Sequence, residues 1–158
     1  MDRLPLIKVR KGKIMKDDKI IKKDVVGYIE NLAKEYGSVY AIDLDGYRKN
    51  SANLGLYKKV ARHLWIDAYP RYVEDVMDLT IIGTNRITIW NMDESMLKEV
   101  KEMIEKDVYL SGKDVFKVAS MVKKYGFKGI VLHEGQEAKE DIETWKIYLN
   151  EYVVKRIR

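Results

Sequence analysis

Residues 39–42 (VYAI), 64–66 (LWI) and 86–90 (RITIW) are three short apolar segments of the chain. Continuous runs of β-branched and aromatic residues are typical of strands buried on both faces of a parallel sheet. Helical periodicity separates the three segments, over residues 54–62 and 71–80. We therefore predict parallel strands joined by helices in this part of the chain.

The same alternation continues on both sides of this stretch. Further strands are predicted over 5–16, with a turn at 11–13, and over 108–110 and 129–132. Further helices are predicted over 17–36, capped by Asp18 and ended by Gly37, over 94–106 and 113–125, and from about 138 to the C-terminus. Six strands thus alternate with six helices, which indicates βαβ units with right-handed crossovers. A (β/α) barrel and a doubly wound open sheet share this pattern.

The composition indicates one domain spanning residues 1–158. Hydrophobic residues make up 46% of the chain, which is enough for one packed core, and no linker rich in Gly, Pro or Ser divides it. The chain has no cysteine, which excludes a disulfide framework, cysteine metal sites and a thiol nucleophile. The net charge is +5, but the cations are interleaved with acids. Because a nucleic-acid binder usually carries a basic face, nucleic acid is not the expected partner.

We expect a cytoplasmic protein with no membrane partner. No apolar run approaches the length of about 18 residues that a membrane span requires, and the N-terminus lacks the apolar region of a signal peptide. Lys, Glu and Ile are abundant and Gln136 is the only glutamine. This bias is typical of proteins from thermophiles.

Polar residues that follow the predicted strands are candidates for a functional site. In both architectures ligands bind at the carboxyl ends of the strands. The residues at these positions are Asp43, Asp45, Asp67, Asn91, Ser111, His133 and Glu134.

Four segments carry a recognisable pattern: 40–47 (YAIDLDGY) followed by Asn53, 64–71 (LWIDAYPR) followed by 74–76 (EDV), 83–89 (GTNRITI), and 5–14 (PLIKVRKGKI). Together they resemble the histidine-biosynthesis ribotide isomerase and cyclase family, whose members are ribulose-phosphate-binding TIM barrels. The segment 64–71 is most similar to an archaeal, methanogen-type subgroup of uncertain function. The resemblance implies an α/β, parallel (β/α) TIM-barrel-like fold and isomerase-type chemistry on a sugar phosphate.

The chain departs from this family at the positions that carry the reaction. The family has a catalytic Asp at the end of the first strand, where this chain has Lys8, and a second at the end of the fifth strand, where this chain has Ser111. An isomerisation of this type needs paired acid and base groups. The glycine-rich phosphate loop after the third strand is replaced by a segment containing Tyr69, and the fourth-strand phosphate contact by Trp90 and Asn91. The histidine-pathway reaction is therefore not assigned.

The length is also short for a complete barrel of this family. Such barrels have about 250 residues and rarely fewer than about 200, so 158 residues allow about six βα units. An unclosed parallel sheet would expose two edges that are prone to association. We therefore expect a homo-oligomer that covers them, or a last helix folded across the gap.

The first functional hypothesis is binding of a small phosphorylated or otherwise anionic metabolite at the rim of the barrel. Asp43 and Asp67 are the candidate catalytic acid and base. Lys8, Asp45, Arg71 and Asn91 are the candidate ligand-binding residues. No metal or cofactor is expected.

Two other functions remain open. A barrel that lacks the paired acids would act without catalysis, in assembly or regulation. Alternatively, Asp43-x-Asp45-Gly46 after an apolar strand resembles the first motif of haloacid-dehalogenase-type phosphatases, in which the first Asp is the nucleophile and Mg²⁺ is required. A further reading of the Asp pair is purely structural, as hydrogen-bonding groups of a loop that ends a strand.

Overall fold

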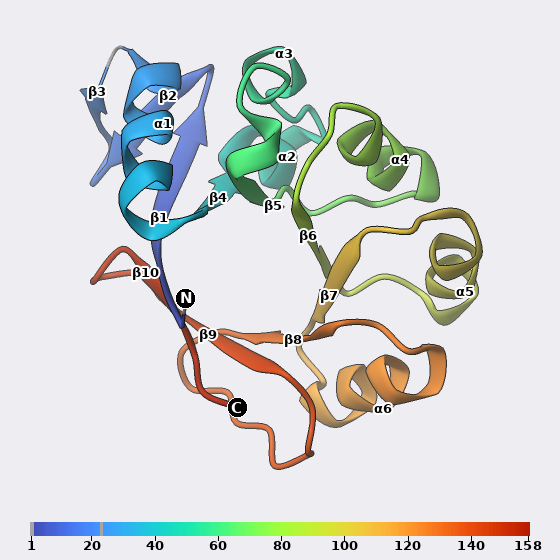
Figure 1. Ribbon diagram of the computed structural model, residues 1–158. Helices are drawn as coiled ribbons and strands as arrows, with labels where there is room; N and C mark the ends of the chain where they lie inside the picture. The colour runs from blue at the N-terminus through green and yellow to red at the C-terminus, as the bar shows by residue number, and fades with distance from the viewer. Residues whose placement is uncertain (1, 23) are drawn as a thin grey trace.

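A computed structural model describes residues 2–22 and 24–158 (Figure 1). This part of the chain contains ten strands and six α-helices. The strands are β1 (Arg3–Arg10), β2 (Lys13–Lys16), β3 (Lys19–Lys22), β4 (Val39–Asp43), β5 (Leu64–Asp67), β6 (Arg86–Trp90), β7 (Asp107–Ser111), β8 (Gly129–Leu132), β9 (Thr144–Tyr148) and β10 (Val153–Arg156). The helices are α1 (Val25–Tyr36), α2 (Leu44–Lys49), α3 (Leu54–Tyr57), α4 (Val73–Ile81), α5 (Glu94–Met103) and α6 (Val115–Tyr125), with a 3₁₀ turn at Ala61–His63.

Eight of the strands form a closed, mixed barrel. The strands β1, β4, β5, β6, β7, β8 and β9 pair with their neighbours in parallel. The last strand, β10, is antiparallel to β9 and to β1, and it completes the circle. The helices lie outside the ring of strands (Figure 1). The strands β2 and β3 extend the sheet beyond the barrel, because β2 pairs with the C-terminal half of β1.

The predicted α/β, parallel (β/α) TIM-barrel-like fold of about six βα units is therefore wrong. The structure is an eight-stranded mixed barrel, and an antiparallel hairpin of β9 and β10 closes it. The helix predicted from about residue 138 to the C-terminus does not form. Its apolar residues Ile142, Trp145, Leu149 and Val153 recur every three or four positions, which favours a helix. Trp145 and Ile147 are nevertheless both buried in the barrel, with the two-residue period of a strand.

The N-terminal region also differs from the prediction. A third strand, β3, occupies residues at which a helix was predicted, and Asp17 and Asp18 have positive φ angles in the turn before it. Asp18 is therefore not a helix cap. Asp24 caps α1 instead, by accepting from the Gly27 amide at 3.1 Å. The predicted helix also included Lys23, which lies outside the described residues.

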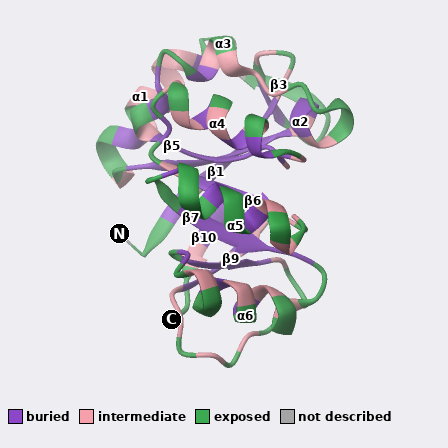
Figure 2. Ribbon diagram, turned by 90° about the vertical axis from the view of Figure 1, so that its right-hand side faces the viewer, coloured by how far each residue is buried: buried purple, intermediate pink, exposed green. Residues whose placement is uncertain are grey.

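The other sequence predictions of strands are confirmed, since residues 39–42, 64–66, 86–90, 108–110 and 129–132 lie within β4 to β8. These segments are buried almost without interruption, as their apolar runs indicated. Figure 2 shows this buried layer of strands between helices whose outer faces are exposed. Gly37 ends α1 as predicted, with a φ of 87° and its amide donating to the Ala33 carbonyl at 2.8 Å.

The inside of the barrel is filled by aromatic and aliphatic side chains. Trp65 is completely buried at its centre, with ring centroids of Tyr109 at 4.3 Å, Tyr40 at 4.9 Å and Trp145 at 5.2 Å. Edge-to-face and tilted contacts of this kind stabilise a core beyond the area they bury. A second core cluster lies between the strands and the helices. The strands therefore have apolar contacts on both faces, and polar groups concentrate at the ends of the barrel.

The homo-oligomer was expected because an open barrel sheet would expose two edges. Closure of the barrel removes both of these edges, so the oligomer stays a prediction without that argument. The expectation that the last helix folds across a gap is wrong, because strands close the barrel. Within the described residues, no helix has the length and apolarity that crossing a membrane requires.

The closing hairpin generates a stability prediction at Gly129. A Cβ at this position would lie 2.3 Å from the Glu143 carbonyl oxygen, which accepts the Ile130 amide at 2.9 Å. Gly129→Ala must therefore displace β9, and we expect it to lower the free energy of unfolding by about 1–3 kcal/mol. Gly55→Ala is the matched control, because no atom lies within 4 Å of its Cβ position. Urea unfolding measures both variants, and equal stability of the two would contradict the close packing of β9 on β8.

Candidate functional site

The parallel strands end together at one end of the barrel, which we call the mouth. Strand register places Lys8 beside Ile42, Ile42 beside Asp67, and Asp67 beside Thr88. Directly paired residues of neighbouring strands point to the same face of a sheet. The side chains of this row therefore face the barrel interior, where Asp67 and Thr88 contact the aromatic cluster. A lysine and a carboxylate thus face the same interior, separated by a single strand.

Asp67 is completely buried beneath two tyrosines. Its Oδ2 accepts from the Tyr40 hydroxyl at 2.7 Å, and its Oδ1 accepts from the Tyr47 hydroxyl at 2.7 Å. Tyr40 belongs to β4 within the barrel, whereas Tyr47 reaches over from α2 and is only partly buried. Tyr47 therefore separates the carboxylate from solvent.

The hydrogen-bond chain behind Asp67 has a defined direction. Trp65 Nε1 donates to Thr88 Oγ1 at 2.9 Å, and Thr88 Oγ1 lies 3.0 Å from the Tyr40 hydroxyl. Because Tyr40 donates its proton to Asp67, the Thr88 hydroxyl is the donor in this last contact. The chain ends on the carboxylate as an acceptor, an arrangement that favours the ionised form of Asp67. Burial opposes that charge and raises the pKa of Asp67 to about 6, although the two tyrosine donors pull it in the other direction.

Asp43, the other predicted catalytic acid, has its oxygens occupied by the local backbone and side chains. It is completely buried and accepts from the Gly46 amide at 2.7 Å, from the Asn53 amide and side chain at 2.9 Å each, and from the Tyr57 hydroxyl at 2.5 Å. Four donors satisfy the approximate capacity of a carboxylate. This geometry favours the structural interpretation of Asp43, as the group that ties α2 and α3 to the end of β4.

Asp45 continues the same bracing toward the N-terminal strands. Its Oδ2 accepts from the Lys11 amide at 2.6 Å and from Asn53 Nδ2 at 2.9 Å, while Asn53 Oδ1 accepts from the Gly12 amide at 2.8 Å. These backbone and side-chain donors lower the pKa of Asp45, although burial opposes them as the largest single influence. Asp45 therefore anchors the turn between β1 and β2 beside the mouth.

Arg71 also binds backbone groups. Its Nη1 donates to the Gly46 carbonyl and its Nη2 to the Tyr47 carbonyl at 2.8 Å, and its guanidinium lies 4.9 Å from the Tyr69 ring centroid. Tyr69 in turn contacts Tyr47 edge to face at 5.2 Å. Arg71 and Tyr69 together hold Tyr47 in place over Asp67.

Two lysines converge on one aromatic ring at the other side of the mouth. Lys8 Nζ and Lys16 Nζ each lie 5.2 Å from the Tyr152 ring centroid. Tyr152 comes from the turn between β9 and β10 and packs against the interior cluster. Neither lysine forms an ion pair with any described residue. Two uncompensated ammonium groups therefore lie no more than twice that distance apart, which is an arrangement that attracts an anion.

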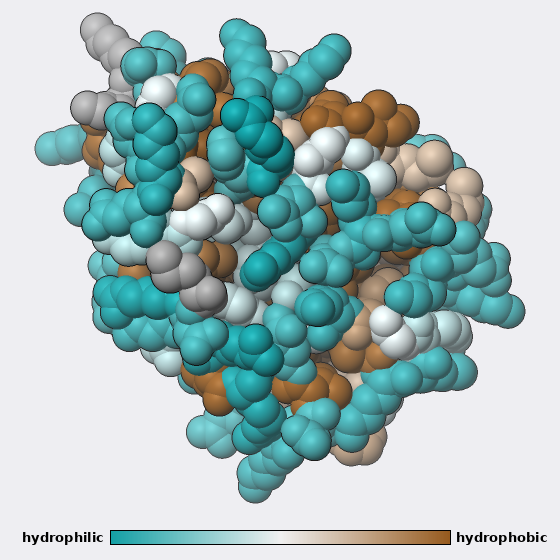
Figure 3. Space-filling view, in the orientation of Figure 1, coloured by the Kyte–Doolittle hydropathy of each residue, from teal (hydrophilic) through white to brown (hydrophobic). Residues whose placement is uncertain are grey.

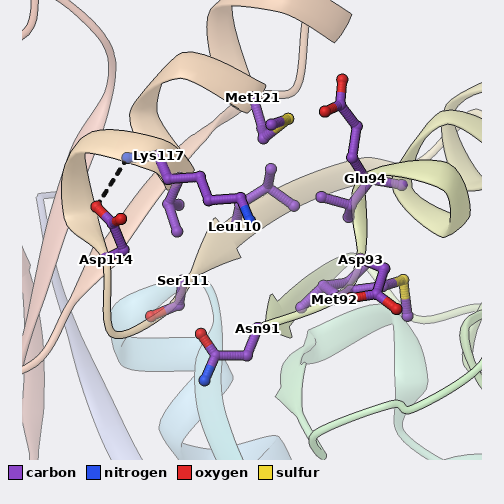
Figure 4. A pocket seen from close by; sticks show the side chains of 12 residues that line it. Asn91, Met92, Asp93, Glu94, Leu110, Ser111, Asp114, Lys117 and Met121 are labelled. Atoms are coloured by element: carbon purple, nitrogen blue, oxygen red, sulfur yellow. Dashed lines mark hydrogen bonds between the residues drawn. The ribbon is translucent and has the colours of Figure 1, made fainter.

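Asn91 lies in a separate pocket between α5 and α6. Its Oδ1 accepts from the Lys113 amide at 3.0 Å, and its own amide donates to the Ser111 carbonyl at 2.9 Å. The pocket has a volume of about 130 Å³, with Asn91, Ser111 and Asp114 near one end, as Figure 4 shows. Its apolar wall includes Leu110 and Met121.

The remaining rim candidates make local contacts. Ser111 Oγ donates to the Val131 carbonyl at 2.6 Å, and Glu134 accepts from the Leu149 amide at 3.1 Å. The His133 ring meets Trp90 edge to face at 4.8 Å, and burial lowers the pKa of His133, which favours the neutral imidazole. Its Nε2 is buried without a hydrogen-bond partner among the described residues.

Only part of the predicted site comes together. Lys8 and Asp67 face the same interior, whereas Asp43 and Asp45 brace loops and Arg71 holds backbone carbonyls. Sequence reasoning missed Lys16 and Tyr152, because Tyr152 fell in the segment predicted as a helix. It also missed the role of Tyr40 and Tyr47, although the segment 40–47 places one tyrosine in the predicted strand and the other just after it.

Among the described residues, no group of three or more His, Cys, Asp or Glu side chains is placed to hold a metal ion. Neither a scan of protein-family models nor a search of curated proteins finds a match to this chain.

Burial of Asp67 generates a pH-dependence prediction. An Asp in an unfolded chain titrates near 3.9, whereas the pKa of Asp67 in the folded protein is about 6. The folded state therefore binds the proton more tightly, and the contribution of Asp67 to stability falls as pH rises from about 4 to about 6. We expect the free energy of unfolding, taken relative to Asp67→Asn, to fall by about 2–3 kcal/mol between pH 4 and pH 7. Urea unfolding at a series of pH values measures this difference, and a difference that does not change with pH would contradict the burial of an ionisable carboxyl.

Proposed function

We propose that this protein binds a small anionic metabolite, phosphorylated or carboxylated, at the mouth of its barrel. The observation that supports this best is the convergence of Lys8 and Lys16 on the ring of Tyr152. The ring attracts each ammonium group through a cation–π contact, and together the two lysines concentrate positive charge at this side of the mouth. An anion bound beside the lysines neutralises part of this charge and accepts charge-assisted hydrogen bonds from an ammonium group that reaches it.

The surroundings of the two lysines favour a small ligand that has an anionic and a neutral part. Tyr152 offers a ring that packs on the interior cluster, and the partly buried Tyr47 offers a hydroxyl above Asp67. Lys8 faces the interior from the same row as Asp67, so a ligand held by its anion at Lys8 extends toward Tyr47. A phosphorylated sugar fits this arrangement, since one of its hydroxyl groups can bind the Tyr47 hydroxyl.

Isomerase-type proton transfer on such a sugar phosphate is a second candidate, and one observation favours it. A carboxyl with a pKa near 6 is close to the range of an effective general base. Because Asp67 is fully covered, Tyr47 would relay the proton: its hydroxyl gives a proton to Asp67 Oδ1 while it accepts one from the ligand. Incorporation of solvent deuterium next to the carbonyl of a bound ketose phosphate, lost in Tyr47→Phe, would support this reaction. Binding without any incorporation would leave a non-catalytic binding protein.

The phosphatase alternative gains no support from the geometry. Its nucleophile would be Asp43, and both oxygens of that side chain are buried and accept hydrogen bonds from α2, Asn53 and Tyr57. An attacking carboxylate needs an oxygen that reaches the phosphorus atom.

The binding proposal predicts which lysines matter. We expect isothermal titration calorimetry at low ionic strength to detect inorganic phosphate and a small sugar phosphate, and to detect the uncharged parent sugar more weakly. Lys8→Met and Lys16→Met should each weaken phosphate binding by about tenfold, since each removes one charge-assisted contact. Lys98→Met is the control, because Lys98 is exposed on α5, away from the mouth.

Two results would overturn the proposal. One is that the wild-type protein binds the sugar phosphate no better than the parent sugar. The other is that the double variant Lys8→Met/Lys16→Met binds phosphate as the wild type does.

A further inference from the structure

A second binding surface lies on the part of the sheet that extends beyond the barrel. The strands β1, β2 and β3 form an antiparallel meander there, and a groove of about 490 Å³ runs over it. The residues that line the groove are Arg10, Lys11, Lys13, Met15, Asp18, Lys19 and Ile20. We call this surface the hairpin groove. It adjoins the lysine pair at Tyr152, because Lys8 pairs with Met15 and Lys16 pairs with Lys19, but neither Lys8 nor Lys16 lines it.

The walls of the hairpin groove are strongly basic. Four of its lining residues are cations and one, Asp18, is an acid. None of the four cations forms an ion pair with a described residue, because the three ion pairs in this part of the chain lie elsewhere. Figure 3 shows charged, hydrophilic side chains over much of the surface of the molecule in this view. The groove is therefore complementary to a partner with acidic groups.

The floor of the hairpin groove is apolar, and a free strand edge borders it. Met15 and Ile20 are directly paired across β2 and β3 and so share one face. β3 is the last strand of the sheet, and its other edge has no strand partner among the described residues. The side chains of Ile20 and Ile21 are 51% and 42% exposed. Unpaired N–H and C=O groups beside exposed apolar side chains are the features to which an extended peptide adds as a strand.

From these observations we infer that the hairpin groove binds an acidic, extended segment of a partner protein, which pairs with the free edge of β3. Alternate residues of an extended segment point to one face, so apolar side chains can contact Met15 and Ile20 while acidic ones meet Lys19 on the other face. Lys13 lies on the same face as Met15 and adds positive charge at the border of the floor. Pairing of β3 with a second copy of itself is opposed, because Lys19 would approach the basic strand of that copy. Single-stranded nucleic acid is disfavoured, because the groove has no aromatic side chain on which bases stack.

Fluorescence anisotropy of labelled peptides tests separately whether the groove selects acidic side chains and whether its apolar floor contributes to binding. We expect a short peptide of alternating Glu and Val to bind, and both a Lys–Val peptide and a Glu–Ser peptide to bind at least about tenfold more weakly. The double variant Lys13→Glu/Lys19→Glu should lose the Glu–Val peptide, and Lys13→Gln/Lys19→Gln should weaken it to a smaller extent. The matched control is Lys98→Glu/Lys106→Glu, two exposed positions in α5 and the loop after it, which should bind as the wild type does.

Several results would overturn the inference. Tighter binding of a labelled single-stranded oligonucleotide than of the Glu–Val peptide would identify a nucleic-acid surface instead. Equal binding by the wild type and Lys13→Glu/Lys19→Glu would move the site elsewhere. Amide hydrogen exchange tests the strand pairing: the Ile20 or Ile21 amide should exchange more slowly with peptide bound, and unchanged exchange of both would exclude strand addition. Phosphate binding is measured independently, with the Lys8 and Lys16 variants. A failure of the peptide proposal can therefore be told apart from a failure of the anion-binding proposal.

Discussion

Pairing of β1 with two different partners along one edge is the constraint on which the rest of the structure depends. Its first residues pair with β10, as in Leu4 with Val154, and its last residues pair with β2. The first pairing closes the barrel, and the Leu6 amide donates to the Tyr152 carbonyl at 2.9 Å at the point where the two partners meet. The chain is too short for eight strand–helix units, so a hairpin supplies the two last strands, and a closed sheet leaves no unpaired barrel edge.

The closure determines what lies at the mouth. The turn between β9 and β10 brings Tyr152 beside Lys8, and β2, which pairs with the same strand, brings Lys16 to the same ring. On the other side of the mouth, Asp43 and Asp45 position α2 so that Tyr47 covers Asp67. The two aspartates that follow β4 and end β5, Asp43 and Asp67, thus have different environments. Asp43 accepts hydrogen bonds from four donors, whereas Asp67, which is equally buried, accepts from two.

The strands β4 to β8 could be predicted from the sequence, because each is a short, continuous apolar run that is too short for a helix and typical of a strand buried on both faces. The position of Asp67 at the mouth followed from the strand before it. The closing hairpin could not be predicted, since Trp145 and Ile147 are surrounded by apolar residues at helical spacing. The environments of Asp43 and Lys8 could not be predicted either. Tyr57 and Tyr152 are brought to them by tertiary contacts, for which local spacing gives no signal.

Native-state amide hydrogen exchange measured by NMR tests the closure of the barrel most directly. The amides of Leu6 and Arg156 donate across the β1–β10 junction, to the carbonyls of Tyr152 at 2.9 Å and Asp2 at 2.8 Å. If the barrel is closed, the Leu6 amide exchanges as slowly as the amides of β4 and β5, and Arg156 is protected although it lies near the chain end. Rapid exchange of Leu6 and Arg156 beside protected amides in β4 and β5 would contradict closure, and with it the arrangement of Lys8, Lys16 and Tyr152 at the mouth.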